Sequence, residues 1–237
     1  MNIAIDAHPL GTHAGGNETF IRRLLEGIRA VGCSHQIVAL VNPDFPEGSA
    51  VAGFPAYRLP RRSSVHRVMI GLPKVCRDVR ADLLHVQYIA PPQCPCPFVV
   101  TLHDMSWLRV PDTMPTLDRW RLRTLVPSTL RRAARVFVVS QAMKTEAINL
   151  YGVPEEKVDW TPNSVDTSFR LIPEQAEMVR QKYALPASFI LYVGALQPRK
   201  NLLRLAAACS MLAQKGFPHR LVIVGKRGWL HRRVDAE

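Results

Sequence analysis

The chain has 237 residues, 47% of them hydrophobic, and its 31 Lys and Arg side chains against 19 acidic ones give a formal net charge of +12. This apolar content excludes an intrinsically disordered chain and is enough for one large domain, or one domain plus part of another. The positive charge favours an anionic partner such as a nucleotide, a polyphosphate, an acidic membrane surface or nucleic acid, unless it reflects only an Arg-rich composition.

The chain carries few targeting or redox signals. Its opening residues, MNIAIDAHPLG, lack a basic n-region and place Asp6 inside the first apolar run, unlike a signal peptide. No apolar stretch reaches the roughly 18 residues that a membrane-spanning helix needs. The five cysteines are odd in number and scattered, so neither a disulfide framework nor a zinc site is expected. We therefore predict a cytoplasmic protein and leave attachment to the inner face of a membrane open.

Short runs of Val, Ile and Leu alternate with amphipathic stretches of helical period along the first part of the chain. The predicted strands are 2–7, 36–41, 56–59, 82–86, 98–103, 136–140 and 157–161. The predicted helices are 18–31, 65–79, 117–134 and 141–150. Pro127 is expected to kink or split the third helix. This alternation is typical of a parallel sheet covered by helices, so the predicted fold class is α/β.

A second series of elements follows a polar connection that contains one predicted helix. The series consists of a strand at 189–194, a helix at 202–215 and a strand at 220–225. It predicts the first β-α-β unit of a second domain. We therefore expect a first domain at 1–170, a linker and helix at 171–187, and an incomplete second domain at 188–237.

Residues that follow strands are the site candidates, because ligands of open parallel sheets bind beyond the carboxyl ends of the strands. Gly15 and Gly16 follow the first strand and precede a helix, where backbone amides can approach a phosphate. An ordinary flexible loop is the alternative. His103, followed by Asp104, ends the fifth predicted strand, where it can exchange a proton, hold a sugar hydroxyl or simply bond a nearby carbonyl. His8 has the same ambiguity with weaker support.

Two polar segments later in the chain are further candidates. The segment TPNSVDTSF combines Pro with Asn163 and Asp166 in the manner of a turn. Arg199 and Lys200 lie between a strand end and a helix start, where the helix dipole and two positive charges favour an anion. An isolated Arg-Lys pair is usually just solvated, but this position after a strand favours a phosphate site.

Taken in this order and spacing, six segments make the chain resemble the retaining GT-B glycosyltransferases that use nucleotide-sugar donors, the large "glycosyl transferases group 1" family. The segments are IAIDAHPLGTHAGGNET, VVTLHDMSWL, ARVFVVSQAMKTEAI, TPNSVDTSF, LYVGALQPRKN and LVIVGKRGW. They extend from the start of the chain to about Leu230. The resemblance implies two Rossmann-like domains facing a cleft, with the acceptor on the first and most of the nucleotide-diphosphate sugar on the second.

The resemblance also implies roles for particular residues. The amides of Gly15 and Gly16 would approach the donor phosphates, and His103 would lie beside the transferred sugar as the catalytic residue. Arg199 and Lys200 would neutralise the leaving diphosphate, because preorganised cations stabilise the charge that develops on departing oxygens. No metal or cofactor is required for this. The resemblance gives structural or secondary roles to Asp104, Asn163 and Asp166.

The sequence departs from the family pattern at three places. Ala195 follows the strand-end glycine where many members have Arg, so Arg199 must supply the second cation. Ser164 replaces the glycine of the usual NGVD, which costs about 1 kcal/mol if its φ angle is positive. The family's later pair of glutamates, separated by seven residues and holding the donor sugar and ribose, is absent because the chain ends first.

The leading expectation is a sugar transfer from a nucleotide-diphosphate sugar to a glycan or lipid-linked acceptor, in polysaccharide biosynthesis, impaired by the early end of the chain. The alternative is a non-catalytic sugar- or nucleotide-binding subunit completed by a partner chain. The basic face of helix 117–134 could touch an anionic membrane surface, although a solvated face is favoured. Nucleic acid is not expected as a partner, because no nucleic-acid-binding motif is present.

Overall fold

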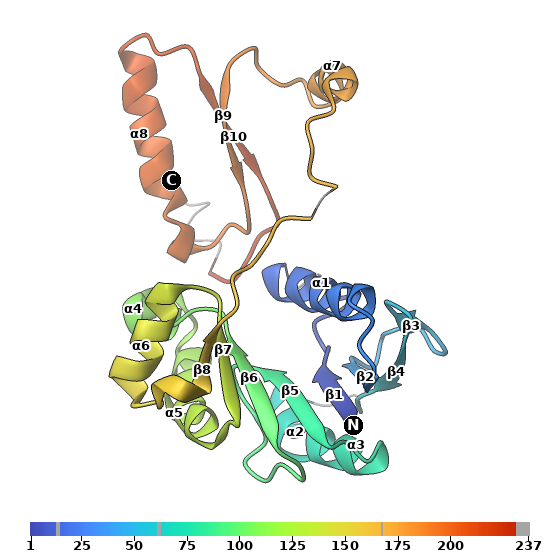
Figure 1. Cartoon of the computed structure of the whole chain (residues 1–237). Coiled ribbons are helices and arrows are strands. Elements are labelled where there is room, and N and C mark those ends of the chain that lie inside the picture. The colour runs from blue at the N-terminus through green and yellow to red at the C-terminus, as the bar shows by residue number, and fades with distance from the viewer. Residues whose placement is uncertain (13–14, 61–62, 167, 231–237) are drawn as a thin grey trace. The chain divides into compact units, whose positions relative to one another are not determined.

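The computed structural model describes residues 1–12, 15–60, 63–166 and 168–230 (Figure 1). Contacts divide the chain into two compact units, residues 1–105 with 121–162 and residues 106–120 with 163–237. His13, Ala14 and Thr167, which belong to two of the motifs that carry the family resemblance, lie outside the described residues.

An eight-stranded sheet forms the centre of the first unit. Its strand order is β3-β4-β2-β1-β5-β6-β7-β8, and each pair is parallel except β3 with β4. The strands are β1 (Asn2–Asp6), β2 (Gln36–Val41), β3 (Ala50–Val51), β4 (Phe54–Arg58), β5 (Leu83–Gln87), β6 (Phe98–Leu102), β7 (Arg135–Val138) and β8 (Val158–Trp160). The predicted α/β class is confirmed, and only the two-residue β3 was missed.

Helical segments connect these strands. They are α1 (Gly16–Ala30), α2 (Ser64–His66), the π-helical turn η1 (Arg67–Gly71), α3 (Leu72–Asp78), α4 (Ser106–Arg109), η2 (Pro111–Thr113), α5 (Thr116–Arg132), α6 (Gln141–Tyr151) and η3 (Glu155–Lys157). The helix predicted at 65–79 is therefore one helical run whose middle widens into a π turn. Pro127 lies inside α5, which continues through it, so the expected split does not occur.

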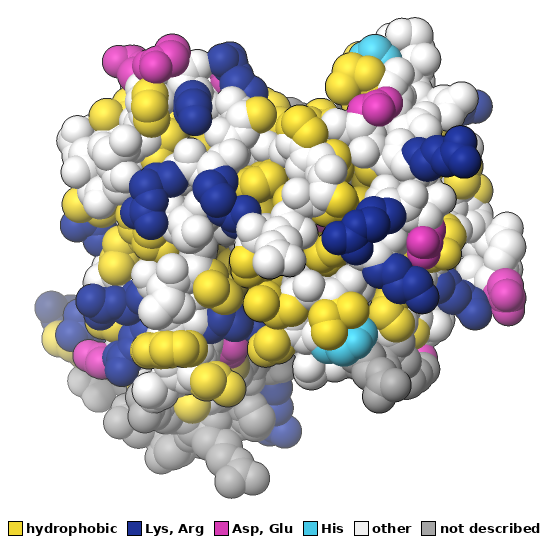
Figure 2. All heavy atoms as spheres, turned by 90° about the horizontal axis from the view of Figure 1, so that it is seen from below, with side chains coloured by type: hydrophobic (Ala, Val, Ile, Leu, Met, Phe, Trp, Pro, Cys, Tyr) yellow, Lys and Arg dark blue, Asp and Glu magenta, His cyan; other side chains and the backbone are white. Residues whose placement is uncertain are grey.

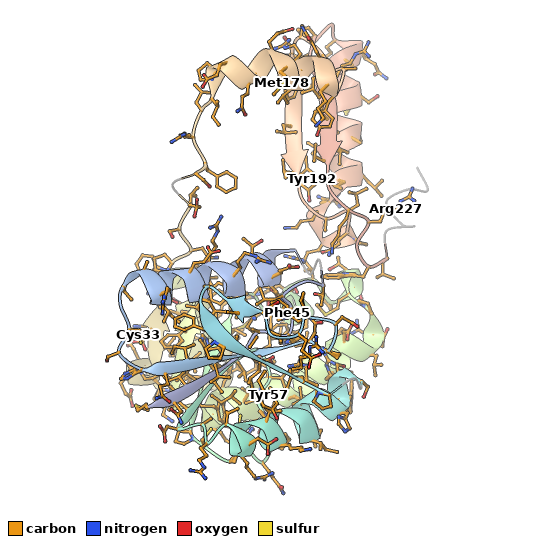
Figure 3. The ribbon with its side chains drawn as sticks, turned by 90° about the vertical axis from the view of Figure 1, so that its right-hand side faces the viewer. Cys33, Phe45, Tyr57, Met178, Tyr192 and Arg227 are labelled. Atoms are coloured by element: carbon orange, nitrogen blue, oxygen red, sulfur yellow. The ribbon has the colours of Figure 1, made fainter. Side chains whose placement is uncertain are left out.

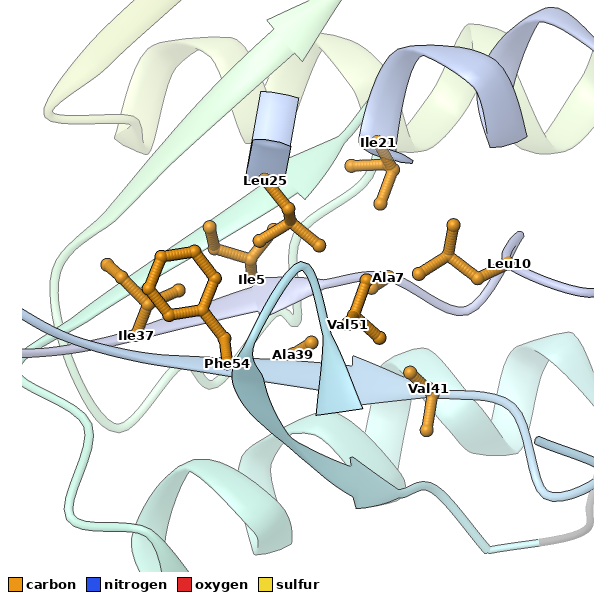
Figure 4. Packing of buried hydrophobic residues seen from close by; sticks show 10 residues of the cluster. All are labelled: Ile5, Ala7, Leu10, Ile21, Leu25, Ile37, Ala39, Val41, Val51 and Phe54. Carbon is orange, nitrogen blue, oxygen red and sulfur yellow. The ribbon is translucent and has the colours of Figure 1, made fainter. Parts of the chain in front are cut away.

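The core of the first unit includes a cluster formed by α1 and β1 to β4 (Figure 4). Side chains alternate along a strand, so Ile5 and Ala7 face α1 while Asp6 between them bonds Arg67 of η1. Leu25 of α1 is fully buried in the cluster. The cluster consists of Ile5, Ala7, Leu10, Ile21, Leu25, Ile37, Ala39, Val41, Val51 and Phe54.

The second unit contains a parallel pair of strands, β9 (Phe189–Val193) and β10 (Arg220–Val224), joined through η4 (Pro198–Lys200) and α8 (Leu202–Gln214). The predicted β-α-β unit is thereby confirmed. It is preceded by α7 (Pro173–Lys182), which carries the exposed Met178 (Figure 3). Figure 3 also shows Tyr192 on β9 and Arg227 beyond β10.

The two glycines of the YVG and IVG segments meet at the carboxyl ends of β9 and β10. Gly194 N donates to Val224 O at 2.9 Å. A Cβ on Gly225 would lie 1.9 Å from Gly194 O, inside the backbone of the neighbouring strand. Gly225 is therefore required by this close approach of two main chains, and it keeps the ends of the two strands together.

The positive charge of the chain is spread out on the face seen in Figure 2. Dark-blue Lys and Arg side chains lie scattered among hydrophobic ones there, without forming one continuous basic patch. Within the described part of the chain, no helix is long and apolar enough to cross a membrane.

We predict that Leu25→Ala lowers the free energy of unfolding by about 2–5 kcal/mol, because truncating a buried leucine removes apolar contacts and leaves a cavity. Urea denaturation followed by circular dichroism measures the change. Val31→Ala is the matched control, because Val31 is 81% exposed just after the same helix. An equal effect of the two substitutions would contradict the described core.

Candidate functional site

The strand order reverses between β1 and β5. From β1 the chain continues to β2 and β4 on one side, and then returns to the other side of β1 with β5. In open parallel sheets, ligands bind at such a switch point outside the carboxyl ends of the strands. A cavity of about 180 Å³ lies there, lined by His8 after β1 and by Gln87 and Tyr88 at the end of β5.

The cavity has polar and apolar lining residues. The polar ones are His8, Asn17, Ser64, Arg67, Gln87, Tyr88 and Arg121. The apolar ones are Pro9, Val65, Val68, Met69, Ile89, Leu122 and Leu125. Among the described residues, no Asp or Glu lines the cavity. Apolar surface with a few convergent hydrogen-bond donors suits a neutral or anionic polar ligand better than a cation.

Asp6, at the end of β1, is a buried carboxylate that holds two of the lining residues. Its side chain is 2% exposed, accepts a hydrogen bond from Arg67 Nη1 and lies 3.0 Å from His8 Nδ1. Burial by itself would raise the pKa of the Asp6 carboxyl, but the Arg67 guanidinium and the His8 ring outweigh it and hold that pKa well below its usual range. Asp6 therefore stays ionised and fixes both partners at the cavity.

A polar ladder crosses from β5 to β6, two strands whose other residues are apolar. His85 Nε2 lies 2.8 Å from Thr101 Oγ1, and two residues further along each strand, His103 Nε2 lies 2.9 Å from Gln87 Oε1. Side chains two residues apart share one face of a strand, which places both rungs on the same side of the sheet. The ladder leads toward the carboxyl ends of the strands, where the cavity begins.

The sequence-predicted catalytic candidate, His103, is one hydrogen bond away from the cavity. Its ring meets the edge of Phe20 at 4.5 Å between centroids and lies 5.5 Å from Tyr88. Because an amide oxygen only accepts, the bond to Gln87 requires the proton on Nε2 and leaves Nδ1 unprotonated in the neutral ring. Burial lowers the pKa of His103, and Asp104 offsets this only in part. The ring is therefore neutral at pH 7.

The backbone is strained where β5 meets the cavity. Tyr88 has a φ of 62°, in the left-handed region that a bulky side chain rarely adopts. Its amide donates to Thr101 O at 3.1 Å, which ties the turn to β6. Residues held in such conformations are frequent at functional sites, but Tyr88 is the only one of the six described non-glycine residues with positive φ that lines the cavity.

Helix α5 contributes the remaining wall and is tied to its neighbours. Arg121 Nη1 donates to Ser64 Oγ of α2 at 2.7 Å. Thr129 Oγ1 accepts from Ala90 N, just after β5, at 3.1 Å. The first contact joins two lining residues of the cavity, and the second ties α5 to the segment after β5.

In the second unit, Arg199 and Lys200 end the short turn η4 before α8. Arg199 is half-buried, and its Nε has no hydrogen-bond partner among the described residues. Asn201, with a φ of 55°, makes no side-chain cap on α8. Two cations before a helix N-terminus that lacks a side-chain cap are suited to an anion.

The structure brings only part of the predicted set to the cavity. His8 lines it and His103 lies next to it, whereas Gly15 and Gly16 are exposed at the start of α1 and do not line it. Gly15 has a φ of 66°, so the glycine is required there. These residues belong to the first unit, and Arg199 with Lys200 to the second.

The NSVD segment lies between β8 and α7. Asp166 Oδ1 accepts from Ser168 N at 2.8 Å, and Asn163 is exposed. Ser164 is not among the described residues with positive φ, so the expected penalty for replacing glycine does not arise. Residues 163–166 have no regular secondary structure and belong to the second unit.

Sequence reasoning missed several cavity residues. Gln87 and Tyr88 follow a predicted strand just as His103 does, so the same rule would have found them. Arg67 and Arg121 are contributed by helices, and no local pattern marks them. Their placement depends on contacts with Asp6 and Ser64 that are distant in sequence.

The cysteines are less scattered than the sequence indicates. Cys76, Cys94 and Cys96 are free thiols that lie close enough to influence one another's pKa. Burial and the neighbouring Cys94 raise the pKa of Cys96 to about 11, although Cys76 opposes this, and burial raises the pKa of Cys76 further. In the part of the chain that the structure describes, no group of three His, Cys, Asp or Glu side chains could hold a metal ion.

Comparison with known protein families matches residues 14–169 to the model of "Glycosyltransferase Family 4". Among curated proteins, the chain is 30% identical over 135 residues to O-antigen chain mannosyltransferase B of Escherichia coli, covering 55% of this chain and 35% of that protein. It is 34% identical over 84 residues to the serotype-specific mannosyltransferase WbdA of Escherichia coli, covering 34% of this chain and 10% of that protein. The chain thus spans about a third or less of the length of these relatives.

Solved structures of glycosyltransferases share the fold. Anabaena Alr3699/HepE in complex with UDP-glucose superposes with a TM-score of 0.68 at 19% identity, covering 99% of this chain and 63% of that one. A glycosyltransferase from Rickettsia africae gives a TM-score of 0.55 at 13% identity, covering 94% of this chain and 68% of that one. At these identities the likeness shows the fold, which is of the GT-B type.

We predict that Asp6→Asn destabilises the protein by about 3–5 kcal/mol, because it leaves the half-buried Arg67 guanidinium unpaired. The Asp6 pKa is lower in the folded state than in the unfolded one, so wild-type stability falls as the pH drops below about 4, and the variant lacks this component. Urea denaturation at a series of pH values measures both effects. Asp112→Asn, at a 94% exposed carboxylate paired with Arg119, is the control and should change stability little.

A second pH effect comes from His85. Burial lowers the pKa of His85 to about 4, so between about pH 6.5 and pH 4 the unfolded chain binds more protons at this residue than the folded one. We therefore expect the free energy of unfolding to fall as the pH is lowered across this window. His85→Gln should flatten this dependence of stability on pH. His35→Gln, at an exposed histidine, is the control. An unchanged slope in His85→Gln would contradict the described burial.

Proposed function

The chain belongs to Glycosyltransferase Family 4, and on that premise we propose that it transfers a sugar from a nucleoside diphosphate sugar to a glycan or lipid-linked acceptor. The observation that carries the proposal is the cavity at the β1/β5 switch point, whose lining residues other than His8 and Pro9 lie within the region matched to the family. Its donor-rich, partly apolar lining suits the hydroxyls and the C–H face of a sugar ring. The cavity is the proposed acceptor site.

His103 is the proposed residue beside the transferred sugar. A neutral ring with the proton on Nε2 can accept a hydrogen bond from a sugar hydroxyl at Nδ1, and its burial keeps it neutral at pH 7. Gly15 and Gly16 at the α1 N-terminus would bring backbone amides to the donor phosphates. Retention of configuration at the sugar carbon rests on the family resemblance of the sequence.

Arg199 and Lys200 are the proposed partners of the leaving diphosphate. Negative charge builds on the departing phosphate oxygens, and cations held in place before the bond breaks stabilise it without reorganisation. The unpartnered Arg199 Nε and the N-terminus of α8 beside it support this role. These charges can act without a metal ion, so a metal-independent transfer remains our prediction.

The relatives suggest which sugar is transferred. Two of the similar proteins are named mannosyltransferases, and one is named for its action on an O-antigen chain. We therefore propose a mannosyl donor and a polysaccharide product. A UDP-glucose complex of the HepE protein makes glucose the competing donor to test.

Contact of α5 with an anionic membrane surface receives less support. Arg121 donates to Ser64, and Arg132 donates to the carbonyls of Pro91 and Pro92. Arg119 pairs with Asp112. Because these arginines have partners within the protein, the basic face offers less free charge to lipid than the sequence implies.

The function is tested by calorimetric binding of GDP-mannose and UDP-glucose, followed by mass spectrometry of a mannose-terminated oligosaccharide incubated with each donor. Addition of one hexose to the oligosaccharide supports the proposal. Donor binding without addition supports the non-catalytic subunit instead. Absence of both binding and addition contradicts the proposed sugar transfer.

We predict that the double substitution Arg199→Ala with Lys200→Ala weakens binding of UDP or GDP by about tenfold to a hundredfold, since hydrogen bonds to charged groups contribute about 1.5–3 kcal/mol. Isothermal titration calorimetry measures the affinity. Arg204→Ala is the control, because Arg204 is an exposed arginine on α8 itself. Equal affinities of the double variant and the control would remove these residues from the donor site.

A further inference from the structure

Gln87 has one satisfied end and one unsatisfied end. Its Oε1 accepts the bond from His103 Nε2 at 2.9 Å. Its Nε2 is buried and has no hydrogen-bond partner among the described residues. A buried amide nitrogen without a partner costs about 1–3 kcal/mol, so most such groups in native proteins are satisfied.

The cavity lies beside the residue that carries this nitrogen. Gln87 is one of the lining residues, and the cavity of about 180 Å³ is several times the ~30 Å³ share of one water molecule. The nearby Asn17 and Ser64 add further polar groups, while Val68 and Leu122 supply apolar surface. A hydroxylated ring combines oxygen acceptors with an apolar face, and so matches both kinds of wall.

The backbone around Gln87 holds the amide in place. The next residue, Tyr88, has the strained φ of 62° and is tied through its amide to Thr101 O. The rung below joins His85 to Thr101 at 2.8 Å. Strain of this kind persists only where the surroundings impose it, so the backbone at Tyr88 is held by its neighbours, and the bond to His103 Nε2 orients the Gln87 side chain.

We propose that Gln87 is a positioning residue that joins the two parts of the site: its Nε2 donates to a hydroxyl oxygen of the acceptor sugar, and its Oε1 thereby holds His103 in one orientation. The ligand class is a neutral hexopyranose at the end of the acceptor. This inference rests on the proposed function for the identity of the ligand, whereas the link from Gln87 to His103 rests on geometry.

Two substitutions separate the two ends of the amide. Gln87→Glu keeps an oxygen beside His103 Nε2 but removes the donor, so acceptor binding weakens while the link to His103 remains. The carboxylate beside the ring also raises the pKa of His103. Gln87→Met keeps the length of the side chain and removes both the Oε1 acceptor and the Nε2 donor. Gln36→Met, at an exposed residue of β2, is the matched control for stability.

The experiment is NMR of the full chain with ¹⁵N-labelled histidine, titrated with methyl α-D-mannopyranoside and, separately, methyl α-D-glucopyranoside up to their solubility limits. We expect one of these sugars to shift the His103 Nε2 resonance in the wild type. In Gln87→Glu the affinity for that sugar should fall about tenfold, and the pKa of His103 should rise. In Gln87→Met the His103 signal should no longer respond to sugar, and the ring should lose its preference for the Nε2 proton.

The inference is overturned if neither sugar perturbs His103 in the wild type, or if Gln87→Met binds and responds as the wild type does. These outcomes do not depend on turnover. Loss of the sugar transfer with an intact sugar-dependent shift at His103 would contradict the proposed function and leave the role of Gln87 standing. Where transfer is measured, the acceptor KM should rise more in Gln87→Glu than kcat falls.

Discussion

A carboxylate buried at the end of the central strand organises the first unit. Asp6 sits on β1, between β2 and β5, and its bonds to Arg67 and His8 join the strand, the loop after it and the π turn η1. A buried charge is tolerated only when it is paired, so the positions of these partners are coupled to one another. Because both partners line the cavity, the same pairing that makes the charge tolerable also shapes the proposed acceptor site.

The second constraint is a set of polar side chains on β5 and β6, two strands whose other residues are apolar. His85, Gln87, Thr101 and His103 bond in two rungs across β5 and β6, where Val and Leu would pack without such requirements. A buried polar network is stable only if its members are satisfied, and Gln87 Nε2 is the atom left over. The leftover donor and the strained Tyr88 both occur where the network reaches the cavity. Two departures from local rules of folding therefore occur together at the site, as is common where a protein binds a ligand.

The sequence was a good guide to the elements and a partial guide to the site. The strand Gln36–Val41 was predicted to the residue, and the others within about two residues, because apolar runs and turn residues are local signals. His103 was found because it lies at the end of a strand. Gln87 also lies at the end of a strand, but its amide gave no reason to single it out. Arg67 could not be found in this way, since its partner Asp6 is 61 residues away. The π turn that carries Arg67 also has no local signature.

The pattern of residues in the chain is sufficient for the α/β class, the order of its elements and the family resemblance, since hydrophobic periodicity and motif spacing are properties of neighbouring residues. The pattern of residues does not predict the cavity or its contacts. Whether Asp6 is ionised, which nitrogen of His103 carries the proton and what Arg67 and Arg121 contact all depend on groups that come together when the sheet forms. Burial and pairing then set the charge and the hydrogen bonds of each side chain, because both act through space and not along the chain.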